Sequence, residues 1–285
     1  MIRLLTFSQF ARLKLLEVLL FLDPAIHQTE TTSRGTILLL SAFLFLLSSG
    51  VGAQTSQFQS ADALPTPAEI LDAAEHAMGE EAVRASILSI STVAACHGPK
   101  GDYETRMISE RSGDLSFQQF FPDHKNIAGI LDGRGWQLGD NARYESIDAI
   151  ETFVLRSHEF PLVALDLRKR FHDFKTVGRT QFEGQPTIQL AMTDELGHSA
   201  NGYFSLASHL PVGVTGTNPR PGGPPAITTL FDGWKVTGGV NLVSHVTILY
   251  GSEKFVFDFK VLTLNTADKN AFQIPETPAG SSDTK

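Results

Sequence analysis

Apolar and polar residues alternate with a period of two over most of the chain beyond residue 87, and this alternation predicts β-strands with one buried face. Glycine-rich turns such as Gly238-Gly239 separate the alternating segments. In the last segment Phe255, Phe257, Phe259 and Val261 share one side. The predicted strands are 87–97, 102–110, 115–121, 126–131, 173–182, 186–193, 199–207, 211–216, 226–234, 240–250 and 253–265. Asp132-Gly133-Arg134-Gly135 is a further predicted turn, followed by a short strand that carries Trp136 and places it on the inner face.

Two regions follow the helical period instead. Thr66, Pro67 and Glu69 form a helix start, and the predicted helix runs to Met78 and stops at Gly79. Residues 145–171 form a second helical region, in which Ser146 is the predicted N-cap and Pro161 separates two helices.

These elements predict an α+β, mostly β fold. We expect one strongly curved antiparallel sheet of about eleven strands, an incomplete β-barrel, with an N-terminal helix and a central helical plug or lid. The expected domain spans residues 66–275, after a flexible leader over 54–65 and before a disordered tail over 276–285.

The first 53 residues have the plan of a secretory signal that follows an N-terminal extension. An eleven-residue apolar run, Ile37 to Leu47, follows Arg34. Small residues at Val51 and Ala53 then predict cleavage after Ala53. The run is shorter than the roughly 20 residues that span a bilayer, although an uncleaved anchor is the alternative interpretation. After cleavage we expect peripheral membrane contact or none.

Charge and cysteine content narrow the function classes. Residues 54–285 carry 19 basic and 28 acidic residues, because residues 1–53 hold four and three of the totals of 23 and 31. This acidic balance argues against nucleic-acid partners, which need a basic surface. The single cysteine, Cys96, cannot form an internal disulfide.

Several short motifs occur in an order and spacing that resemble a known group. Leu131-Asp132-Gly133-Arg134-Gly135-Trp136 comes first, then Phe182-Glu183-Gly184-Gln185-Pro186, and finally Gly239-Val240-Asn241-Leu242. Over residues 66–275 the series resembles bacterial exported proteins similar to the outer-membrane lipoprotein-sorting carriers, the LolA/LolB-like group. The resemblance implies an open half-barrel with a helical lid, a location in the periplasm of a Gram-negative-type bacterium, and an apolar cavity that holds acyl chains.

Aromatic residues are the candidates for lining such a cavity, and ordinary core packing is the alternative for each of them. The candidates are Phe117, Phe120, Phe121, Trp136, Phe153, Phe255, Phe257 and Phe259. Arg168, Lys169 and Arg170 form the one basic cluster. They are candidates for contact with an anionic lipid headgroup or an envelope protein partner, or they simply complement a helix dipole.

The sequence offers little for catalysis. Cys96 and His97 are adjacent, and neighbours on a strand point to opposite faces, so they do not form a dyad. No HExxH or similar ligand spacing occurs, and we expect no metal, cofactor or catalytic residue. The predicted function is an envelope carrier for a lipid or other apolar group. The alternatives are a ligand-free envelope interaction or sensor module, and a hydrolase that uses Cys96 or a histidine cluster.

Overall fold

The computed structural model describes residues 63–139 and 143–274. All that follows concerns the compact unit Leu64–Lys285. The predicted signal, most of the leader and the predicted tail over 276–285 lie outside the described residues. Within the described part, no helix has the length and apolar content needed to cross a bilayer.

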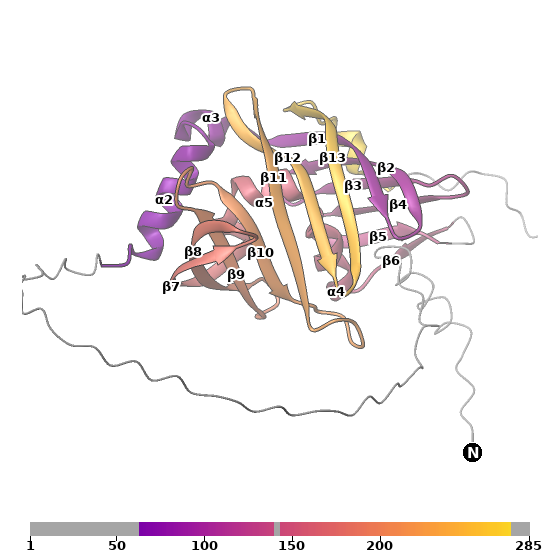
Figure 1. The fold of residues 1–285 in the computed structure, drawn as a ribbon. Coiled ribbons are helices and arrows are strands. Elements are labelled where there is room, and N and C mark those ends of the chain that lie inside the picture. Colours follow the sequence, from indigo (N-terminus) through magenta and orange to yellow (C-terminus); the bar gives the residue numbers. More distant parts are fainter. Residues whose placement is uncertain (1–62, 140–142, 275–285) are drawn as a thin grey trace, which may run out of the picture. The chain divides into compact units, whose positions relative to one another are not determined.

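Thirteen strands form one antiparallel sheet (Figure 1). Their order is β6-β5-β4-β3-β2-β1-β13-β12-β11-β10-β9-β8-β7, so every neighbour is also a neighbour in sequence except the central pair, β1 and β13. The bounds are β1 Ser89–Gly98, β2 Gly101–Glu110, β3 Leu115–Phe120, β4 Lys125–Leu131, β5 Arg134–Leu138, β6 Tyr144–Ser146, β7 Phe171–Phe182, β8 Gln185–Asp194, β9 Ser199–Ser205, β10 Pro211–Thr217, β11 Ala226–Thr237, β12 Val240–Tyr250 and β13 Glu253–Leu264.

The sheet is open and not strongly curled, which corrects the predicted strongly curved incomplete barrel of about eleven strands. Its two edges explain why it stays open. β6 has only three residues, and two register shifts interrupt β7 where it pairs with β8. Neither edge therefore offers a long regular ladder for closure.

Short helices complete the fold. The N-terminal helix, α2 (Pro67–Met78), has the predicted capping box between Thr66 and Glu69. A short helix that the pattern does not predict, α3 (Glu81–Ser86), follows it. The central region contains α4 (Ala149–Arg156), α5 (Phe160–Leu165) and α6 (Leu167–Arg170), and a short 3-10 helix, η1 (Lys269–Phe272), follows β13. The N-cap of α4 is Asp148 rather than Ser146, because Asp148 pairs reciprocally with Glu151, and Pro161 lies in the first turn of α5.

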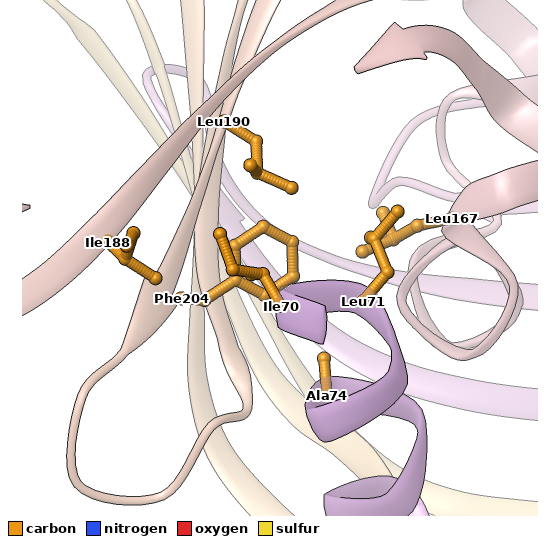
Figure 2. Packing of buried hydrophobic residues seen from close by; sticks show 7 residues of the cluster. All are labelled: Ile70, Leu71, Ala74, Leu167, Ile188, Leu190 and Phe204. Carbon is orange, nitrogen blue, oxygen red and sulfur yellow. The ribbon is translucent and has the colours of Figure 1, made fainter. Parts of the chain in front are cut away.

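The helices α2, α5 and α6 pack on one face of the sheet, which we call the inner face. Ile70, Leu71 and Ala74 of α2 contact a group from the sheet and α6 (Figure 2). That group is Ile188, Leu190, Phe204 and Leu167. Leu162 and Leu165 of α5 pack beside Val240 and Leu242 of β12 in a second cluster. Burial of these apolar side chains, at roughly 25 cal/mol per Å² removed from water, holds the helices against the sheet.

A β-bulge changes the alternation predicted for β13. Val93 pairs with Val261 and the next residue, Ala94, pairs with Phe259, so Lys260 is the extra residue on β13. The extra residue reverses the faces beyond it. Phe255, Phe257 and Phe259 are buried as predicted, whereas Val261 is 44% exposed.

The hairpin between β4 and β5 also differs from the prediction. Its turn has two residues, Asp132 and Gly133, both with positive φ (50° and 73°), as a type I′ turn requires. Gly129 therefore pairs with Trp136, while its neighbour Ala128 pairs with both Phe117 and Gln137. Directly paired residues share a face. Trp136 thus lies on the face opposite to Phe117, which corrects its predicted inner-face position.

Candidate functional site

Aromatic rings from three strands meet on the inner face with rings from α5 and from the residues between α4 and α5; we call the segment from α4 to α5 the lid. We call this group the inner aromatic cluster, and its members are Tyr103, Phe117, His158, Phe160, Phe257 and Phe259. The Phe160 ring centroid lies 5.2 Å from that of Phe257 and 6.5 Å from that of Phe259. The His158 ring lies 5.5 Å from Phe117 and 6.2 Å from Phe257. The segment from α4 to α5 therefore covers the aromatic strands by direct ring contact.

The structure brings together only part of the predicted cavity set. Phe117, Phe257 and Phe259 belong to the cluster, and Phe255 is buried beside it on β13. Phe121 stacks on Tyr103 at 4.8 Å, and Phe153 is half-buried on α4. Phe120 pairs with Glu104 on the opposite face, where Arg106 lies 4.8 Å above its ring.

Trp136 occupies a separate site on that opposite face. Its ring covers Gly129 so closely that a Cβ at position 129 would lie 2.5 Å from it, and it meets Tyr144 edge-on at 5.4 Å. The side chain is 4% exposed and its Nε1 has no hydrogen-bond partner. Trp136 is thus a core residue next to the hairpin and does not approach the inner aromatic cluster.

Cys96 and His97 point to opposite faces, as predicted. Cys96 is 4% exposed, and its Sγ lies 3.3 Å from Thr105 Oγ1. His97 is exposed and its Nδ1 lies 2.6 Å from Asp102 Oδ1. Within the described ranges, no group of histidine, cysteine and acidic residues is arranged to hold a metal ion.

We expect the Cys96 thiol to be inert in the folded protein. Burial raises the pKa of this thiol to about 12, so almost no thiolate forms at pH 8. Dithionitrobenzoate should therefore leave native protein unlabelled over minutes and should label one thiol per chain in 6 M guanidinium. Rapid labelling of the native protein would contradict this expectation and would revive the hydrolase alternative.

The three predicted basic residues are all paired with carboxylates of the chain itself. Arg168 bonds Asp72 and also Glu75 of α2, the latter at 2.7 Å. Lys169 lies 3.2 Å from Asp166. Arg170 forms ion pairs with Glu159 and Glu195. These contacts tie α6 to α2, to the β8–β9 turn and, through Glu159, to the segment between α4 and α5.

His158 and Glu159, between α4 and α5, form a buried polar junction that the sequence pattern does not single out. The His158 Nδ1 lies 2.9 Å from the Val154 carbonyl oxygen, while burial lowers the pKa of His158 to about 4. Glu159 is 0% exposed, and burial raises its pKa to about 7 despite the nearby charges of Arg170 and Arg156. Both residues are therefore held toward their neutral forms, and the His158 ring lies next to the aromatic rings.

Three surface clefts lie elsewhere. One of about 140 Å³ runs between α2 and strands β8 and β9, and one of about 130 Å³ adjoins the ion pairs of Arg170. A third, of about 310 Å³, crosses strands β13, β1, β2 and β3. The inner aromatic cluster lines none of these three clefts.

Comparisons with known proteins place this fold. No protein-family model and no curated protein matches the sequence. A LolA superfamily protein from Nitrosomonas europaea superposes with a TM-score of 0.52 at 10% identity, over 74% of this chain and 99% of that protein. A DUF1329 family protein from Desulfovibrio piger gives 0.49 at 14% identity, over 72% and 95% of the two chains.

An outer membrane lipoprotein-sorting protein domain from Vibrio parahaemolyticus gives a TM-score of 0.48 at 12% identity, over 72% of this chain and 94% of that one. The fold is similar to that of the Nitrosomonas europaea LolA superfamily protein, which belongs to the group that the sequence motifs resemble. At these identities the similarity defines the fold, and the function has to be argued from the site.

Proposed function

We propose that this protein is an exported, non-catalytic carrier or binding protein of the cell envelope. It holds a lipid or other apolar group between the inner face of the sheet and the lid formed by α4 and α5. The observation that carries the proposal is the inner aromatic cluster, in which His158 and Phe160 of the lid cover Phe117 and Phe257 of the sheet.

The contact between lid and sheet at this place is mostly ring against ring. An acyl chain can replace such contacts, because apolar packing is not directional. Each methylene removed from water contributes about 0.8 kcal/mol, so a chain of a dozen methylenes gains about 10 kcal/mol in gross terms. Losing the packing of one buried phenylalanine costs about 3–5 kcal/mol. A bound chain therefore offsets the displacement of Phe160 from Phe257.

The buried polar junction supports a lid that moves rather than a fixed core. Glu159 Oε1 is buried without a hydrogen-bond partner, and such atoms are rare in well-packed interiors. The Arg170 and Arg156 side chains beside it pair with Glu195, which lies outside the lid. The lid is thus held by ion pairs around Glu159 and by the leucines of α5 against β12, while His158 and Phe160 rest on the aromatic rings.

Native mass spectrometry tests the proposal. The full chain is produced in a Gram-negative host and purified from a periplasmic extract without detergent. We expect an added lipid mass that solvent extraction removes. The extracted protein should then enhance the fluorescence of N-phenyl-1-naphthylamine, a neutral apolar dye.

A matched pair of variants locates the binding. Phe257→Trp adds volume beneath the lid and should weaken dye binding about tenfold, in line with the 1–3 kcal/mol cost of overpacking. Phe120→Trp makes the same change on the opposite face and should leave binding unchanged. A clean apo mass, with no dye binding after challenge with phospholipid vesicles and acylated peptides, would favour the ligand-free interaction module instead.

A further inference from the structure

Arg220 is buried without a partner for its guanidinium group. The residue is 5% exposed, and its Nε, Nη1 and Nη2 are all buried and make no hydrogen bond. It forms no ion pair with any carboxylate of the described residues. Arginine has five donors and cannot shed its charge, so burying it unpaired costs several kcal/mol.

The loop that carries Arg220 is held in place. The backbone N–H of Arg220 donates to Asn218 Oδ1 at 3.1 Å. Asn218 Nδ2 donates to the Pro224 carbonyl and to Tyr250 Oη, both at 3.0 Å. A Cβ at Gly223 would lie 2.1 Å from Tyr250 Oη, so this residue must be glycine. These contacts fix the backbone from which the buried Arg220 side chain extends.

The surroundings of Arg220 join the lid to the aromatic cluster. The charges of Glu151 and Asp148 act on Arg220 from the start of α4, but neither residue bonds it. The charge of Arg220 in turn acts on His158, whose ring contacts Phe117 and Phe257. The hydrogen bonds of the loop reach Tyr250 on β12, two residues from Ile248, which pairs with Phe255. The loop that carries Arg220 is therefore bonded to the sheet face that carries the ring cluster.

We propose that Arg220 binds the oxyanionic headgroup, a carboxylate or phosphate, of an amphipathic ligand whose acyl chain lies against the inner aromatic cluster. A guanidinium binds such groups through two parallel hydrogen bonds, which would supply the acceptors that Arg220 lacks. The chain part of this inference rests on the proposed function. The headgroup part adds a chemical class: the ligand is an anionic amphiphile with a carboxylate or phosphate headgroup rather than a neutral lipid.

Displacement of the bound dye by ligands of equal chain length tests the headgroup. The extracted full-length protein is titrated with palmitate, hexadecyl phosphate and neutral hexadecanol, and with acetate and inorganic phosphate as anions without a chain. We expect palmitate, hexadecyl phosphate or both to bind at least tenfold more tightly than hexadecanol. Arg220→Gln should remove this preference and leave dye binding unchanged. Arg106→Gln makes the same charge change on the opposite face and should have no effect.

A second readout separates binding from structural support. Removing a buried unpaired charge should raise the Tm of the extracted protein in Arg220→Gln, and it should abolish the further rise that palmitate or hexadecyl phosphate gives the wild type. A charge that merely holds α4 through Asp148 and Glu151 would instead lower the Tm when removed. Arg220→Lys keeps a charge but loses the two-pronged geometry, and should weaken the preference at least threefold. This variant carries the test if Arg220→Gln does not fold.

Each remaining outcome has one meaning. Equal binding of palmitate, hexadecyl phosphate and hexadecanol, with dye binding intact, would overturn the role of Arg220 and leave the carrier proposal standing. Retention of the preference in Arg220→Gln would also overturn it. If acetate or inorganic phosphate binds as tightly as palmitate and hexadecyl phosphate, the ligand is a free oxyanion. That result would overturn the inference that the ligand carries a hydrocarbon chain. Failure of the wild type to bind dye or acyl compounds would overturn the proposed function itself.

Discussion

Replacing Glu159 with glutamine will make the free energy of unfolding rise with pH between about 4 and 6.5, whereas replacing His158 with phenylalanine will make it fall between about 4.5 and 7. Burial raises the pKa of Glu159 from 4.5 to about 7. The folded state therefore holds this proton more tightly than the unfolded state, and stability is lost as the pH rises from 4.5 to 7. Burial lowers the pKa of His158 from 6.5 to about 4, so stability is lost as the pH falls from 6.5 to 4.

The two effects oppose each other in the wild-type protein. Their slopes cancel between about 4.5 and 6.5, and each variant exposes the slope of the residue that remains. Each shift corresponds to about 3 kcal/mol across its window. Urea denaturation at four pH values from 4 to 7 measures these slopes. In the double variant the free energy of unfolding should change with pH as it does in the wild type. If the single variants show the same pH dependence of the free energy of unfolding as the wild type, the pKa shifts assigned to His158 and Glu159 are wrong.

Phe117→Ala will lower the free energy of unfolding by about 3–5 kcal/mol, whereas Phe120→Ala, three residues along the same strand, will cost about 1 kcal/mol. Phe117 is 0% exposed and contacts His158 on the inner face. Phe120 is half-buried on the other face, where its main partner is the Arg106 guanidinium. The matched deletions therefore measure the difference between the two faces of β3.

Urea denaturation at one pH compares the two variants, with the slope of the transition checked for each. Similar losses in both variants would show that the face assignment along β3 is wrong. It would also remove the basis for separating Phe117 from Phe120 within the predicted cavity set.

Local patterns predict most of the strands and the N-terminal helix of this protein. The cap at Thr66 and Glu69 is specified by residues three apart, and it forms as expected. The alternation of Phe255, Phe257 and Phe259 fixes one face of β13. Such signals are reliable because each depends on neighbours in sequence and on one buried side.

The errors concern the face that a side chain occupies. A single bulge at Lys260 moves Val261 outward, and Trp136 lies opposite to Phe117 because it pairs with Gly129, whose neighbour Ala128 pairs with Phe117. The hydrophobic pattern marks neither outcome, because a bulge adds one residue without a sequence signal and β5 is buried on both of its faces. The face of a side chain at such a position is settled only by pairing with another strand.

The candidate site is less predictable than the fold. Phe117 and Phe257 stand out as aromatic residues in alternating segments, but His158, Glu159 and Arg220 do not. Charged residues are normally exposed, and nothing near Glu159 or Arg220 in sequence marks them as buried. Their burial results from tertiary packing. An arginine inside a Pro/Gly-rich loop is the one local signal that could have drawn attention to Arg220.

The central pairing of β1 with β13 bears on how the chain reaches this fold. Every other ladder joins strands that are consecutive in sequence, whereas this one closes a loop whose ends, Leu88 and Asn265, are 177 positions apart and hydrogen-bonded. During synthesis β1 emerges first among the strands and its partner last. One edge of the early half-sheet thus waits, open to wrong partners, until the final strand arrives. Protection of that edge by a chaperone would matter more here than in a sheet whose first and last strands lie at its margins.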